Sequence, residues 1–164
     1  DEVVEARPDV LTLLHPLTDD RRILTVERLG EEVAAAAGFQ VVVSYNPGYQ
    51  SARRALKEST RQRFVSLEFA YPTEEIESEI VAHESRCDQE VAKKLVTIAR
   101  ATRTLRNQGL REGASTRLAI YAARLTVSGM DVRAACDATF AQGLSDDPEM
   151  VAAIKDLIQV RLTE

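Results

Sequence analysis

The first half of the chain contains short apolar runs whose spacing changes from one run to the next. Apolar residues over 9–18 recur at helical spacing and predict a short amphipathic helix, despite Pro16 within it. Two brief runs, at 23–27 and just after Gly30, predict a small β-hairpin. The first half therefore mixes helix and strand from its start.

Three further segments complete this half. The apolar run 40–45 predicts a buried strand, and it stops at the turn Asn46-Pro47-Gly48. Residues 50–57 predict a short helix, and the alternation over 65–69 predicts another strand. Tyr71-Pro72 then closes the mixed part of the chain.

The second half has helical periodicity throughout. Four polar residues stand at the expected N-caps of successive helices: Thr73, Asp88, Ser115 and Asp131. Gly109 and Gly129 stand just past helix ends, and Pro148 lies near the start of the last helix. The acidic stretch 73–79 is interpreted as a solvated helix face. We predict a mixed domain over 1–71 and an all-helical bundle over 72–164.

Composition narrows the possible functions only slightly. The 164 residues are 45% hydrophobic and 29% charged, with a net charge of −5. This charge argues against general nucleic-acid binding. Apolar runs fall short of the roughly 20 residues that cross a bilayer, and no signal peptide is evident. Cys87 and Cys136 have no metal-type spacing, and we expect two reduced thiols in a cytoplasmic protein.

Two polar motifs could act on a nucleotide. The acidic pair Asp1-Glu2 could hold Mg²⁺ and orient a water, although for the pair taken alone two solvated acids are the favoured explanation. Asn46 has both a donor and an acceptor and could bind a phosphate and a water together. Taken alone, Asn46-Pro47-Gly48 is better explained by a plain turn.

Positive charges form two further candidates. Between Gln50 and Arg63, five basic residues stand against one acidic residue, which suits a phosphate or an acidic neighbouring subunit. A solvated basic helix is the alternative. Arg117 follows the expected N-cap Ser115, where an anion is favoured, but taken alone it is better explained as a surface arginine on an amphipathic helix.

The order of these weak signals resembles that in AAA+ ATPases. More narrowly, the chain looks like the MoxR branch and, within it, the CbbQ/NirQ/NorQ group. Five stretches carry this resemblance, which runs across essentially the whole chain: 1–7, 15–22, 44–50, 59–64 and 113–118.

The resemblance implies a role for each candidate residue. Asp1 would bind Mg²⁺ and Glu2 would polarise the attacking water, as a Walker B pair. Asn46 would be sensor 1 and Arg117 sensor 2. Arg63 is the best match to the arginine finger that reaches a neighbouring subunit's nucleotide, with Arg61 as a second candidate. The hairpin over 23–33 matches an insertion that faces the ring pore.

The resemblance also implies a fold. Residues 1–71 would be the C-terminal part of an α/β AAA+ core, with parallel strands, helices and a β-hairpin. Residues 72–164 would be the all-α lid. The phosphate-loop pattern Gly-x-x-x-x-Gly-Lys-[Ser/Thr] does not occur in the sequence. We therefore expect these residues to be the C-terminal portion of a longer protein and to hydrolyse no ATP alone.

The implied function is an ATP- and Mg²⁺-dependent, homo-oligomeric remodelling chaperone, expected to be a hexamer. A CbbQ-like protein would activate rubisco with a von Willebrand-A-type adaptor, without nucleic acid or membrane. A NirQ/NorQ-like activator of nitric oxide reductase is the alternative. A non-catalytic interaction module is a further hypothesis, because the phosphate loop does not occur here.

Overall fold

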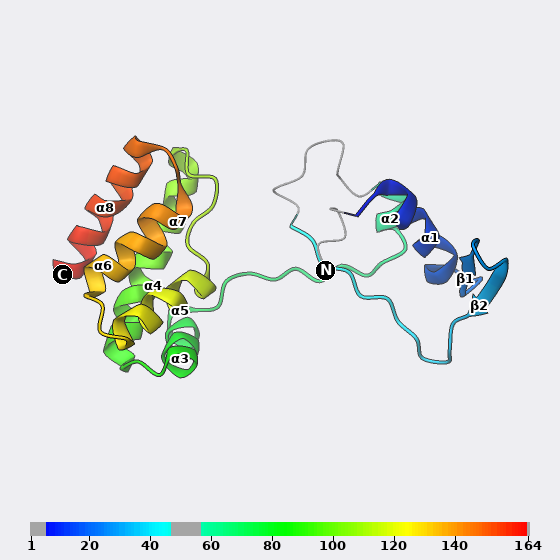
Figure 1. Ribbon diagram of the computed structural model, residues 1–164, viewed down its shortest axis with the longest axis horizontal. Helices are drawn as coiled ribbons and strands as arrows, with labels where there is room; N and C mark the ends of the chain where they lie inside the picture. The colour runs from blue at the N-terminus through cyan, green and yellow to red at the C-terminus, as the bar shows by residue number, and fades with distance from the viewer. Residues whose placement is uncertain (1–5, 47–56, 164) are drawn as a thin grey trace. The chain divides into compact units, whose positions relative to one another are not determined.

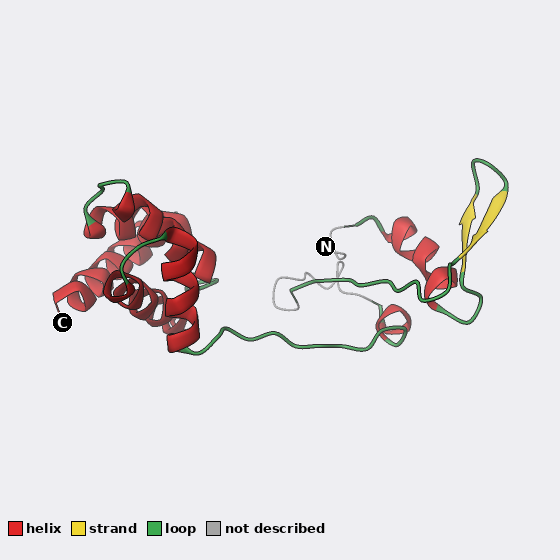
Figure 2. Ribbon diagram, turned by 90° about the horizontal axis from the view of Figure 1, so that it is seen from below, coloured by secondary structure: helices red, strands yellow, loops and turns green. Residues whose placement is uncertain are grey.

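The chain folds into two compact units, Asp1–Glu68 and Phe69–Glu164. The computed structural model describes residues 6–46 and 57–163. Within these ranges, strands occur only in one hairpin of the first unit, and all other regular structure is helical (Figure 2). None of the described helices has the length and apolar character needed to cross a membrane.

The first unit begins with the helix α1 (Pro8–Thr18), which confirms the helix predicted from the apolar spacing. Pro8 occupies the first helical position, where a missing N–H breaks no helical hydrogen bond. Pro16 lies in the last turn, so the helix ends soon after it. Leu17 is buried against the rest of the unit.

The predicted hairpin is also confirmed. Strand β1 (Ile23–Val26) pairs antiparallel with β2 (Glu31–Ala34), and Ile23 faces Ala34 at the open end. Gly30 closes the turn with φ +65°, a left-handed conformation that glycine adopts without strain. Every residue of β2 is exposed.

The two other predicted strands do not form. Residues 41–46 and 65–69 have no regular secondary structure, and the described ranges contain no parallel strand pair. Val42, Val65, Leu67 and Phe69 are 79–92% exposed. An extended segment becomes a strand only when a neighbour accepts its backbone hydrogen bonds. No described segment offers that neighbour, so the prediction of strands at 40–45 and 65–69 is wrong for this structure.

The helix predicted over 50–57 lies almost wholly outside the described residues. Lys57 is instead the residue before a short helix, α2 (Glu58–Arg61). Thr60 is the buried residue of α2, and Arg61 ends it. This single turn is followed directly by Arg63 and Phe64.

The second unit is a helical bundle, which Figure 1 shows with α8 lying along one side. A 3₁₀ turn follows the second helix, and a π-helical turn interrupts the fourth. In chain order the elements are α3 (Glu74–Ser85), α4 (Gln89–Thr104), η3 (Leu105–Gln108), α5 (Thr116–Val127), α6 (Val132–Cys136), η4 (Asp137–Ala141, the π turn), α7 (Gln142–Leu144) and α8 (Pro148–Thr163).

The four predicted N-caps are confirmed. Thr73, Asp88, Ser115 and Asp131 each accept a hydrogen bond from a backbone N–H in the first turn that follows. These bonds satisfy donors that have no partner inside the helix. The helices of this unit therefore begin where local side-chain chemistry directs them.

The core of the second unit is formed where α4, η4 and α8 meet. Leu95, Phe140, Ile154 and Ile158 are among its fully buried side chains. Small residues of α5, such as Ala119 and Ala122, are also fully buried and let this helix approach closely. Cys87 and Cys136 are both free thiols, and burial raises the pKa of Cys136 to about 12.

Candidate functional site

The predicted metal and water-activating residues, Asp1 and Glu2, lie outside the described residues. Their roles remain predictions. Within 6–46 and 57–163, no three His, Cys, Asp or Glu side chains converge as a metal site would require.

Asn46 is the last described residue before position 57 and is exposed. The structure does not place it at a strand end, because the strand expected over 40–45 is absent. Its proposed contact with a phosphate therefore stays a prediction that rests on the sequence.

The two candidate arginine fingers lie in different environments. Arg61 ends α2 and is exposed, and its side chain forms no ion pair or hydrogen bond with another described residue. Arg63 is half-buried, and its Nη1 donates to the carbonyl of Ser59. The buried Nε of Arg63 has no hydrogen-bond partner among the described residues. Arg63 is thus held against α2, and its buried Nε–H donor is unpaired within the described part of the chain.

A histidine connects this region to α1. The Nε2 of His15 lies 3.0 Å from the Oγ1 of Thr60. Leu14, Val43 and Phe64 help to line the small apolar pocket beside the ring. Burial first, and then the positive charge of Arg63, lowers the pKa of His15 below 6.5. These contacts make His15 a link between α1 and α2.

Arg117 is the second residue of α5. Its side chain is exposed, and it forms no ion pair or hydrogen bond with another described residue. The N-cap Ser115 accepts a hydrogen bond from the N–H of Leu118, and the first turn contains no acidic residue. A guanidinium at such a helix start can bind an anion.

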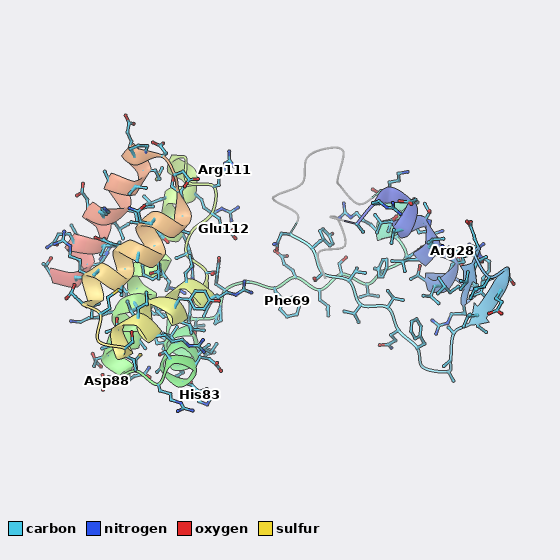
Figure 3. The ribbon with its side chains drawn as sticks, in the orientation of Figure 1. Arg28, Phe69, His83, Asp88, Arg111 and Glu112 are labelled. Atoms are coloured by element: carbon cyan, nitrogen blue, oxygen red, sulfur yellow. The ribbon has the colours of Figure 1, made fainter. Side chains whose placement is uncertain are left out.

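The loop that leads into α5 has one exposed and one buried part. Arg111 and Glu112 project from it into solvent (Figure 3). Gly113 and Ala114 are buried, and a Cβ built on Gly113 would lie 2.4 Å from the Cα of Arg103. Only glycine allows this approach, so the loop packs directly on the backbone of α4.

Hydrogen bonds hold the buried part of the loop. The N–H of Ala114 donates to the Oγ1 of Thr102 over 2.9 Å, and the Nε of Arg103 donates to the carbonyl of Ala114 over 2.8 Å. Both polar backbone atoms of Ala114 are thereby paired with α4. This fixes the path of the chain just before Arg117.

A buried ion pair lies beneath this loop. The side chain of Glu77, on α3, is fully buried. Its two carboxylate oxygens accept hydrogen bonds from Arg103 at 2.5 and 2.9 Å. The hydroxyl of Thr116 donates to the same carboxylate over 2.8 Å. The interpretation of 73–79 as a solvated acidic face is therefore wrong at Glu77, because arginines on α4 turn this position inward.

Two more contacts complete the surroundings of Glu77. The guanidinium of Arg103 lies 3.6 Å from the centroid of the Tyr71 ring, a cation–π contact. Arg100 lies 3.7 Å from a Glu77 oxygen and donates to the carbonyl of Pro72 over 3.2 Å. The sequence pattern did not predict this cluster. One signal was available, since Arg100 and Arg103 are three positions apart on an amphipathic helix and so lie on neighbouring turns.

Glu77 makes the stability of the second unit sensitive to acid. Burial would raise the pKa of Glu77, but hydrogen bonds from Arg103 and Thr116 outweigh it and hold the pKa below 4.5. The unfolded chain then binds this proton more readily, so the stabilisation is complete above about pH 4.5 and is lost as the pH falls through the lowered pKa.

We expect the difference in unfolding free energy between the chain and Glu77→Gln to be largest near pH 7 and to shrink below pH 4.5. Urea unfolding, followed by the helical circular dichroism signal at several pH values, measures it. Glu79→Gln, an exposed neighbour on α3, is the matched control. A difference that stays constant down to pH 3 would contradict the assignment.

Two protein families match this chain, each over a different part of it. Residues 77–161 match the CbbQ/NirQ/NorQ C-terminal family, and residues 1–64 match the AAA domain of the dynein-related subfamily. The two matches cover most of the chain.

Three curated relatives are similar over nearly the whole chain. Protein NorQ of Paracoccus denitrificans is 54% identical over 157 residues, which is 96% of this chain and 58% of the relative. Denitrification regulatory protein NirQ of Pseudomonas aeruginosa is 51% identical, over 99% of this chain and 62% of the relative. Protein CbbQ of Hydrogenophilus thermoluteolus is 51% identical, over 97% of this chain and 60% of the relative.

The chain spans about three fifths of the length of these relatives. The family match covers the helical unit with Glu77 and Arg117, and the AAA match reaches Phe64, just past Arg63. The chain therefore belongs to the CbbQ/NirQ/NorQ family of AAA+ proteins.

Proposed function

We propose that the full-length protein carrying these residues is an ATP-hydrolysing subunit of a homo-oligomeric ring, a hexamer, that remodels a client enzyme. The observation that carries the proposal is the pair of matches, to an AAA domain over 1–64 and to the CbbQ/NirQ/NorQ family over 77–161. The start of α5 supports it, because the chain there is held by buried contacts while Arg117 remains exposed and unpaired among the described residues.

Each candidate residue has a role in this proposal. Asp1 would hold Mg²⁺, which neutralises charge on the phosphates of ATP, and Glu2 would orient the attacking water. Asn46 would bind the terminal phosphate. Arg63, or Arg61 as second candidate, would reach the nucleotide of a neighbouring subunit. Arg117 would bind a phosphate of its own subunit's nucleotide.

Two client enzymes are possible under this proposal. The CbbQ-like alternative makes it inhibited rubisco, reached through a von Willebrand-A-type adaptor in the cytoplasm. The alternative client is nitric oxide reductase, and two of the similar proteins are named denitrification regulatory protein. Identity to the relatives named CbbQ, NirQ and NorQ is 51–54%, so sequence similarity favours neither client.

The test is a client assay with the full-length protein. Purified protein, candidate adaptor and ATP are added to inhibited rubisco or to immature nitric oxide reductase, and recovery of client activity is followed. ATP-dependent recovery of one client, lost in Glu2→Gln, supports the proposal and identifies the client. ATP turnover without recovery of either client would overturn both client assignments. Absence of turnover, with salt-sensitive assembly, would favour an interaction module instead.

A further inference from the structure

The buried carboxylate of Glu77 lies beneath the loop that presents Arg117. We propose that Glu77, together with Arg103, is a positioning residue that aims Arg117 at a nucleotide phosphate. The inference rests on the proposed function, because it takes Arg117 as the residue that contacts the phosphate. It adds a role for two residues that would act through Arg117.

Several contacts restrain the loop that precedes Arg117. Thr116, the residue before Arg117, donates to the Glu77 carboxylate over 2.8 Å. Two residues earlier, the carbonyl of Ala114 accepts a hydrogen bond from Arg103, and its N–H donates one to Thr102. Gly113 lies against the backbone of Arg103. Four consecutive residues before Arg117, with the N-cap Ser115 among them, are therefore held by named contacts.

The side chain of Arg103 is itself held rigidly. Glu77 accepts two parallel hydrogen bonds from its guanidinium, Ala114 accepts a third, and the Tyr71 ring covers one face. A bidentate pair of this kind fixes direction as well as distance. Arg103 therefore keeps one orientation, and the loop that rests on it keeps one path.

Burying the ion pair of Glu77 and Arg103 has an energetic cost. A buried ion pair often stabilises a protein no more than apolar side chains of the same volume would, because both charges lose their hydration. The pair of Glu77 and Arg103 is thus poorly explained by stability alone. Its geometric effect is specific, since the same carboxylate binds both Arg103 and Thr116 and so ties α4 to the start of α5.

The test is a double-mutant cycle in the full-length protein. The measured quantity is the preference for a non-hydrolysable ATP analogue over ADP, taken from the two dissociation constants. Arg117→Ala and Glu77→Gln are each expected to lower this preference about tenfold, and the double variant is expected to lower it no further. Glu79→Gln, exposed on the same helix, is expected to leave it unchanged.

The outcomes are distinguishable. An unchanged preference in Arg117→Ala overturns the role of Arg117 and this inference with it. A loss in Arg117→Ala, with no loss or an additive loss in Glu77→Gln, overturns the positioning role alone. If thermal unfolding shows that Glu77→Gln does not fold, Thr116→Val replaces it in the cycle. That variant removes only the hydroxyl bond to the carboxylate, and its additivity with Arg117→Ala decides the question.

Discussion

Arg63→Ala in the full-length protein is expected to lower ATP turnover by about 10³-fold, whereas nucleotide binding stays close to that of the unmodified protein. The reason is that an arginine supplied by a neighbouring subunit stabilises charge that develops only in the transition state. Steady-state ATPase rates and equilibrium nucleotide binding measure the two effects. Arg61→Ala, two positions away and exposed, is the matched comparison.

Subunit mixing tests whether this arginine acts from the neighbour. Arg63→Ala and Glu2→Gln subunits are each expected to be inactive, but a mixed ring contains interfaces that combine an intact Glu2 with an intact Arg63. Turnover should therefore reappear on mixing. A large loss of ATP turnover in Arg61→Ala, with near-normal turnover in Arg63→Ala, would make Arg61 the arginine finger. Normal turnover in both variants would mean that neither arginine has this role.

Phe140→Ala is expected to lower the unfolding free energy of the 164-residue chain by about 3–5 kcal/mol. Phe140 is fully buried in the core of the second unit, with Ile154 and Ile158 of α8 in the same cluster. Truncation removes buried apolar surface and leaves a cavity that a helix bundle closes only in part. Urea denaturation, followed by circular dichroism at 222 nm, measures the loss.

The chain offers a matched control for this substitution. Phe69 is 90% exposed, so Phe69→Ala makes the same chemical change with little loss of buried area. We expect its effect to stay within about 0.5 kcal/mol. A loss below about 1 kcal/mol in Phe140→Ala would mean that this core is far looser than the structure shows.

The second unit could be predicted from the sequence because its signals are local. A cap such as Ser115 and the apolar spacing that follows it lie within a few residues of each other, and both are confirmed. The hairpin at 23–34 was predictable for the same reason, since its partner strands are adjacent in the chain. Whether residues 40–45 and 65–69 form strands could not be predicted in this way, because the pairing partner of a strand cannot be read from one segment.

In the candidate site, too, only the features that depend on neighbouring residues could be predicted from the sequence. The position of Arg117 at a helix start follows from Ser115, one residue from the start of α5. The role of Glu77 depends on Arg103, which is 26 residues away in sequence and on another helix. Its acidic neighbours predict an exposed face, and only tertiary packing turns this one carboxylate inward. Local charge patterns therefore cannot tell a solvated glutamate from a buried one.

The π turn Asp137–Ala141 affects how relatives should be aligned with this chain. A π turn holds one residue more than the α turn that it replaces. Three consecutive residues of this turn, Thr139 to Ala141, are buried. A relative with a single-residue gap here could keep the same helix axis with an ordinary α turn. Core positions on either side would then correspond only after the alignment is shifted by one residue.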